Sequence, residues 1–141
     1  MTIYLDTSVL VAALTAETAT PRIQQWLSDS VALDLAVSGW VVVEFSSALS
    51  LKMRDGRLDA SMHERALTGF RLLANGSLTM LDIKGSHFTA AAGIADQHSS
   101  GLRAGDALHL AICADYGAAI CTLDRRIGAN ALSFGVKPIL L

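Results

Sequence analysis

The sequence predicts an α/β fold with a mainly parallel sheet, and two observations lead to this prediction. Short runs of β-branched or apolar residues alternate with helical segments along the whole chain, a pattern typical of parallel sheets with right-handed crossovers. The hydrophobic fraction is 52% and the mean hydropathy is +0.43, yet no run approaches the roughly 18 apolar residues of a membrane helix. This composition favours strands that are buried on both faces of a sheet.

The elements follow from local patterns taken in chain order. Residues 3–5 suit a pleated strand, and the apolar run Val9–Leu14 turns helical. Thr20 and Pro21 supply the N-cap and first residue of a second helix. Hydrophobic periodicity and turn residues then predict a strand over 33–37, a helix over 40–54, a helix over 63–74 capped by Asp59, a strand over 78–83, helices over 86–97 and 106–115, a strand over 118–122, a helix over 127–132 and a strand over 136–140, with Pro138 favouring a sheet edge.

Length and composition restrict the class of protein. The 141 residues predict one domain, residues 1–141. A net charge of −2, from 11 Lys and Arg against 13 Asp and Glu, argues against a general nucleic-acid coat, although an enzyme with a local basic rim stays possible. Cys113 and Cys121 lie in apolar surroundings and predict buried free thiols, as in a reducing cytoplasm. Because no basic segment precedes the first apolar run, we expect neither a signal peptide nor a membrane location.

Four acidic residues occupy unusual places in this pattern. Asp6 and Asp124 directly follow predicted strands, Asp106 opens an apolar helix, and Glu44 interrupts the apolar face of another. Asp is a favoured helix cap, and Glu44 has an ordinary explanation if it pairs with a basic residue or lies near solvent. However, ligands bind at the carboxyl edge of open α/β sheets, and oxygen-only ligand sets suit Mg²⁺ or Mn²⁺. The scattered histidines show no zinc pattern, and His109 is predicted to be a hydrogen-bonded core residue.

Several motifs together resemble one family. The segments Leu5-Asp6-Thr7-Ser8, Gly105-Asp106-Ala107-Leu108-His109-Leu110-Ala111 and Thr122-Leu123-Asp124, with Glu44 between them, are similar to those of PIN domains, above all the VapC-type toxins of bacterial toxin–antitoxin pairs. The resemblance implies a five-stranded parallel sheet in the order 3-2-1-4-5. It also implies a metal-dependent endoribonuclease that forms a homodimer and is inhibited by a cognate antitoxin. The catalytic and metal-binding residues would be Asp6, Glu44, Asp106 and Asp124, supported by Ser8 and Thr122.

One departure from the family pattern concerns the segment after the last acid. Family members often carry a Phe there, where this chain has Arg125-Arg126-Ile127. The two arginines would either contact an RNA phosphate or remain as solvated surface charge. The mechanism that the resemblance implies is phosphodiester hydrolysis assisted by one or two Mg²⁺ or Mn²⁺ ions. A general base drawn from Asp6 or Asp124 is compatible with the sequence, which does not decide between them.

Other classes of protein share part of the pattern. A phospho-receiver domain has a similar fold type, an acidic pocket and a Lys-Pro pair such as Lys137-Pro138, but it needs two acids after the first strand. A phosphatase of the Asp-x-Asp-x-Thr type is excluded because Ser8 stands where its second Asp is required. A non-catalytic domain in which the acids only cap helices stays open, and RNA cleavage would distinguish it from an enzyme.

Overall fold

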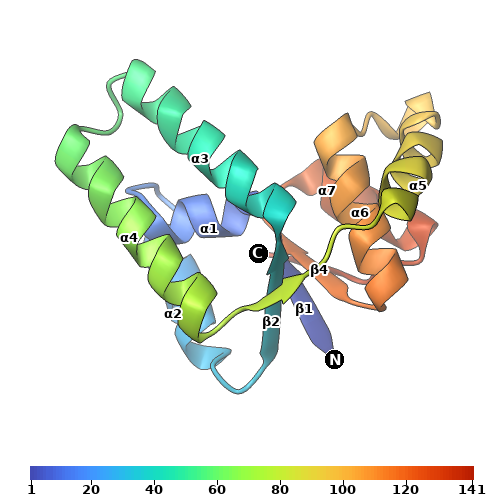
Figure 1. The fold of residues 1–141 in the computed structure, drawn as a ribbon, viewed down its shortest axis with the longest axis horizontal. Helices are drawn as coiled ribbons and strands as arrows, with labels where there is room; N and C mark the ends of the chain where they lie inside the picture. The colour runs from blue at the N-terminus through green and yellow to red at the C-terminus, as the bar shows by residue number, and fades with distance from the viewer.

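The computed structural model describes residues 1–141 and contains one parallel sheet between two layers of helices (Figure 1). The strand order is β3-β2-β1-β4-β5, and all four neighbouring pairs are parallel. The strands are β1 (Thr2–Leu5), β2 (Asp34–Ser38), β3 (Thr79–Leu81), β4 (Ala119–Thr122) and β5 (Pro138–Leu140). The predicted α/β class and the order 3-2-1-4-5 are therefore confirmed, and Pro138 lies in an edge strand as expected.

The helices cover both faces of the sheet (Figure 1), and the face that they cover changes where the chain reverses the direction in which it adds strands. One side carries α1 (Thr7–Leu14), α2 (Thr20–Asp29), α3 (Gly39–Arg54) and α4 (Ala60–Gly76). The other carries α5 (Gly85–Ala95), α6 (Ala104–Tyr116) and α7 (Arg125–Asn130), with short 3₁₀ turns at η1 (His98–Ser100) and η2 (Ala131–Phe134). The reversal lies between β1 and β4, and this is the position where open α/β sheets bind ligands.

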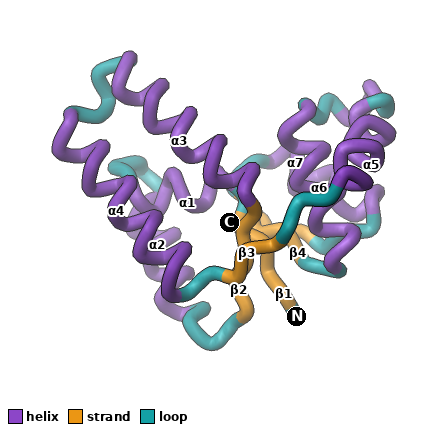
Figure 2. The backbone as a smooth tube through the Cα atoms, in the orientation of Figure 1, coloured by secondary structure: helices purple, strands orange, loops and turns teal.

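The core lies on both faces of the three central strands. Figure 2 shows these strands between the two helical layers. Helix α1 buries residues 9–13 and α6 buries residues 107–113, which explains why both segments are apolar almost all round. The two cysteines are free and buried, as predicted, and burial raises the pKa of the Cys121 thiol to about 12. None of the helices combines the length and apolar character needed to cross a bilayer.

The structure corrects two predicted helix starts. Thr20 is the first residue of α2 and not its N-cap, because its hydroxyl donates to the carbonyls of Ala12 and Thr15 instead. Asp106 is the third residue of α6, whose N-cap is Arg103. By contrast, Asp59 does cap α4, accepting a hydrogen bond from the Met62 amide at 2.8 Å. Hydrophobic periodicity predicts where a helix lies, but its first residue depends on the hydrogen bonds at its N-terminus.

Candidate active site

Asp6 lies at the carboxyl end of the central strand β1 and is almost fully buried, with 3% of its surface exposed. Its Oδ1 accepts hydrogen bonds from the Ser8 amide at 2.9 Å, the Val9 amide at 3.4 Å and the Ser8 hydroxyl. Its Oδ2 accepts one from the Thr122 hydroxyl at 2.5 Å. Burial raises the pKa of Asp6, and the hydrogen bonds from Ser8 and Thr122 oppose this rise. Asp6 is thus both a helix cap and a buried acid.

Two hydroxyl groups connect the end of β1 with the end of β4. The Thr122 hydroxyl donates to Asp6 and accepts from the Asp124 amide at 2.9 Å. The Ser8 hydroxyl likewise donates to Asp6 and accepts from the Leu123 amide at 3.0 Å. Ser8 and Thr122 therefore fix the backbone before Asp124 relative to the Asp6 carboxylate, and their supporting role at a cation site stays a prediction.

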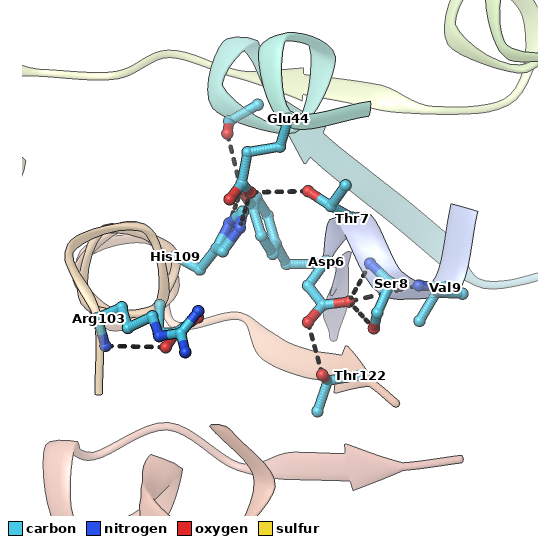
Figure 3. A network of polar contacts seen from close by, with 11 residues as sticks. Asp6, Thr7, Ser8, Val9, Glu44, Arg103, His109 and Thr122 are labelled. Carbon is cyan, nitrogen blue, oxygen red and sulfur yellow. Dashed lines mark hydrogen bonds and ion pairs between the residues drawn. The ribbon is translucent and has the colours of Figure 1, made fainter. Parts of the chain in front are cut away.

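Glu44 reaches the same region from α3, and it is held by a different set of donors. Its Oε1 accepts from His109 Nε2 at 2.5 Å and from the Thr7 hydroxyl at 2.7 Å, as Figure 3 shows. Burial alone would raise the pKa of Glu44, but the hydrogen bond and charge of His109, together with Thr7, outweigh it and hold this pKa below its ordinary value. In the structure Glu44 is therefore paired with a histidine and a threonine, and no Lys or Arg forms an ion pair with it.

Asp106 and Asp124 both line a polar cavity of about 450 Å³. Its other lining residues are Arg103, Arg125 and Arg126, and none of these arginines forms an ion pair within the chain. The cavity is open to solvent and has three positive charges beside two negative ones. An anion such as a phosphate fits these charges.

Each of the two cavity acids uses a single oxygen for a local backbone contact. Asp106 Oδ2 accepts from the Arg103 amide at 2.9 Å. Asp124 Oδ1 accepts from the Arg126 amide at 2.7 Å and the Ile127 amide at 3.2 Å, capping α7. The second oxygen of each acid has no partner within the chain and remains available to a ligand.

The four predicted acids gather in one region without forming a closed ligand set. Glu44 Oε2 would lie 2.9 Å from a Cβ atom at Gly105, the residue before Asp106, so these two acids are neighbours. Even so, no three His, Cys, Asp or Glu side chains are close enough to hold one metal ion. The donor chemistry fits a hard cation, and the half-buried or exposed positions of Asp106 and Asp124 leave their side chains room to turn. The metal-binding role of all four stays a prediction.

Sequence reasoning missed several residues of this region. Arg103 was not singled out, although it lines the cavity, and Thr7 was not recognised as a donor to Glu44. Gly105 has the closest approach of any glycine in the chain, since a Cβ there would press on Glu44 and Trp40. A detectable signal was present for Thr7, because it adjoins Asp6 at the strand end. Gly105 belongs to a segment that resembles the family motif, although its approach to Glu44 was not predicted. Arg103 gave no local pattern to distinguish it.

Comparison with known proteins identifies the family. The sequence profile of the PIN domain family matches residues 3–131. The chain belongs to the PIN domain family. No significant match to a curated protein accompanies this finding. The motifs around Asp6, Asp106 and Asp124 all fall within the matched range, so the resemblance seen in the sequence is confirmed for this PIN domain.

Solved structures support the same fold over nearly the whole chain. FitAB bound to an IR36 DNA fragment has a TM-score of 0.72 at 21% identity, covering 98% of this chain and 94% of that one. VapBC2 of Rickettsia felis, bound to a promoter DNA fragment, has a TM-score of 0.72 at 13% identity, covering 100% and 99%. VapC20 of Mycobacterium tuberculosis, a toxin that cleaves the sarcin-ricin loop, has a TM-score of 0.70 at 17% identity, covering 90% and 93%.

The strand order also decides against one alternative. Phospho-receiver domains have the flavodoxin-like order 2-1-3-4-5, in which β1 and β3 are neighbours. In this PIN domain β1 lies between β2 and β4, and β3 is an edge strand. In this chain Lys137 precedes the edge strand β5 and Pro138 begins it.

Proposed function

We propose that this PIN domain, residues 1–141, is the toxin of a type II toxin–antitoxin pair and hydrolyses RNA phosphodiester bonds with Mg²⁺ or Mn²⁺. The observation that carries this proposal is the polar cavity in which Asp106 and Asp124 face Arg103, Arg125 and Arg126. The cavity lies at the carboxyl edge of the sheet. VapC20, which has a similar fold, is a toxin that cleaves the sarcin-ricin loop. Acids and unpaired arginines side by side suit a site that handles a cation and a phosphate together.

The roles that we propose for the four acids follow from how deeply each one is buried. Asp6 is fixed by its four hydrogen bonds and serves as the rigid ligand. Asp106 and Asp124 would offer their free oxygens to a cation, together with Oε2 of Glu44. The arginines at 103, 125 and 126 bind the scissile phosphate and orient it. A bound cation would polarise the phosphate and lower the pKa of an attacking water.

The test is cleavage of RNA by the purified chain in Mg²⁺ or Mn²⁺, with and without EDTA. Asp6→Asn and Asp106→Asn should each reduce cleavage by more than about 100-fold, beyond the usual cost of losing a group that only supports a ligand. Asp59→Asn is the matched control, because Asp59 also caps a helix but belongs to α4 and does not line the cavity. Circular dichroism should be unchanged in all three. Full cleavage by both site variants would contradict the enzyme proposal and favour a non-catalytic domain.

We also propose that a small antitoxin covers the site, and that two copies of this chain associate. An apolar pocket of about 280 Å³ lies beside the cavity, lined by Trp40, Phe88, Ala91, Ala92, Ala95, Ala104 and Leu108. The phenyl ring of Phe88 is exposed, at 58%, and Ala104 adjoins the cavity residue Arg103. An inhibitor with a basic side chain for the acids and apolar side chains for this pocket fits both features.

The partner proposal is tested by co-expressing the chain with its neighbouring gene. A complex should co-purify, and Phe88→Asp should weaken it while leaving the thermal unfolding of the free chain almost unchanged. Val31→Asp is the control, since Val31 is also apolar and exposed but lies between α2 and β2 and does not line the pocket. Light scattering of the free chain measures the dimer. A monomer that co-purifies with nothing would count against both partners.

A further inference from the structure

A row of buried side chains extends from Glu44 into the core. His109 Nδ1 lies 2.9 Å from the Tyr4 hydroxyl, which lies 2.7 Å from the Ser38 hydroxyl. Tyr4 and Ser38 are fully buried and His109 is 2% exposed. The three residues belong to β1, the end of β2 and α6, so only the folded sheet brings them together. The proposed function gives no role to any of them.

The hydrogen bonds of this row hold the His109 ring at both of its nitrogens. The ionised Glu44 carboxylate only accepts, so His109 Nε2 donates the hydrogen bond between them. On the other side of the ring, Nδ1 lies 2.9 Å from the Tyr4 hydroxyl. Burial raises the pKa of Tyr4 far above its ordinary value, which keeps this hydroxyl protonated. Tyr4 in turn shares a hydrogen bond with the Ser38 hydroxyl, so the ring cannot turn without losing contacts at both nitrogens.

The row acts on one particular oxygen of Glu44. His109 and Thr7 both donate to Oε1, so the carboxylate cannot rotate without losing two hydrogen bonds. Oε2 accepts none, and it faces Gly105, where the missing side chain leaves space for it. Asp106 follows directly in the sequence. The free oxygen of Glu44 is therefore presented to the first turn of α6, beside an acid that lines the cavity.

We propose that His109 is a positioning residue, held in place by its contact with Tyr4, which orients Glu44 so that Oε2 faces the cation site. This inference rests on the proposed function, in which Glu44 is a cation ligand. Groups that hold a metal ligand from behind commonly set its orientation and basicity. A histidine that only filled the core would need neither a particular tautomer nor a carboxylate partner.

The first experiment requires no variant. Two-bond ¹H–¹⁵N correlation spectra of the wild type report which ring nitrogen of each histidine carries the proton. His87 is an internal reference, because its Nδ1 accepts from the Lys84 amide at 3.0 Å and its Nε2 lies 3.1 Å from Asp115. We expect a proton on Nε2 of both rings. Tyr4→Phe should alter the spectrum of His109 and leave that of His87 unchanged. An unprotonated His109 Nε2 in the wild type would overturn the inference.

The second experiment measures cation binding without RNA, as the rise in melting temperature on titration with Mn²⁺. His109→Leu should weaken the apparent affinity by about 10- to 100-fold, the range seen for groups behind a metal ligand. His109→Gln retains an N–H donor and should recover part of the loss. His87→Leu is the matched control, since it removes an equally buried, carboxylate-bound histidine on α5. The kcat for RNA should fall in parallel with cation affinity, while KM stays close to the wild-type value.

The outcomes separate the two proposals. A wild type that binds Mn²⁺ and cleaves RNA, with His109→Leu and His109→Gln no different from His87→Leu, overturns the role of His109 and leaves the proposed function intact. A wild type that neither binds Mn²⁺ nor cleaves RNA overturns the proposed function, and the role of His109 with it. If His109→Leu does not fold, His109→Gln and Tyr4→Phe decide the question with the same titration.

Discussion

Asp6 and Asp124 have the same local surroundings in the sequence and opposite surroundings in the structure. Each follows a strand, and each caps the next helix with its Oδ1. Asp6 is buried and its second oxygen is bound by Thr122, whereas Asp124 is exposed and its second oxygen has no partner. Both strands are buried, but Asp6 directly follows β1 and its amide donates to the Cys121 carbonyl of β4, whereas Leu123 separates Asp124 from the end of β4. The local pattern sets the cap, and the distance from the end of the strand accompanies the difference in burial.

This contrast suggests different tasks for two similar acids. A buried carboxylate with four hydrogen bonds keeps one position, and it tolerates little change in its neighbours. An exposed carboxylate with one free oxygen can follow a ligand. Three experiments test how far the contrast extends, and they measure stability in EDTA so that no cation contributes.

The largest effect should be the pH dependence that Asp6 imposes on stability. Burial raises its folded-state pKa above the unfolded value, so the folded protein binds the proton more tightly and the ionised form costs stability. Wild-type stability should therefore rise as pH falls through the raised pKa. Asp6→Asn removes this dependence, and its advantage in free energy of unfolding should grow from acidic to neutral pH. Urea unfolding at a series of pH values measures it; an Asn variant that is less stable than wild type at neutral pH would contradict it.

The next effect concerns the hydroxyl that holds Asp6. Thr122→Val keeps the shape but leaves the buried Asp6 Oδ2 and the Asp124 amide without their partner, and should cost about 1–3 kcal/mol of unfolding free energy. Thr79→Val is the control, because Thr79 also donates to an aspartate, Asp34, but in an exposed position. Its cost should stay within about 0.5 kcal/mol. Equal costs in urea unfolding would mean that burial does not distinguish the two sites.

The smallest effect belongs to Asp124. Asp124→Ala removes the cap of α7 and should cost about 1 kcal/mol, whereas Asp124→Asn should be nearly neutral because Asn caps as well as Asp. Both variants should lose RNA cleavage if Asp124 binds the cation. Thermal melting and cleavage assays on the same samples separate the two roles. Cleavage retained by Asp124→Asn would reduce Asp124 to a helix cap and end the parallel with Asp6.

Most of the fold was predictable because it depends on periodic patterns. The order of strands and helices follows from apolar runs such as Val9–Leu14 and from stops such as Gly117, which ends α6 with a positive φ of 63°. The edge strand β3 was predicted too long, since only Thr79–Leu81 pair with β2. An edge strand pairs on one side only, and natural edge strands are commonly short.

The candidate site was only partly predictable, because its contacts join distant segments. The strand ends that carry Asp6 and Asp124 were visible as local features. The hydrogen bonds of Glu44 were not, since His109 lies 65 residues away and Tyr4 lies 105 residues from His109. His109 was predicted to be a hydrogen-bonded core residue, which is confirmed, but spacing alone could not name its partners. Arg103 reached the cavity through the tertiary fold and had no local signature.

The hydrogen bond between Thr122 and Asp6 also limits when the site can form during protein synthesis. These residues are 116 positions apart, and Asp6 extends a β1–β4 ladder in which its amide donates to the Cys121 carbonyl at 3.1 Å. Until β4 has left the ribosome and paired with β1, Asp6 lacks its hydroxyl partner and Asp124 is absent. Because long-range pairing closes late in folding, we expect the nascent chain to lack this site until β4 has paired with β1. The proposed activity would therefore appear only after these two distant strands have joined.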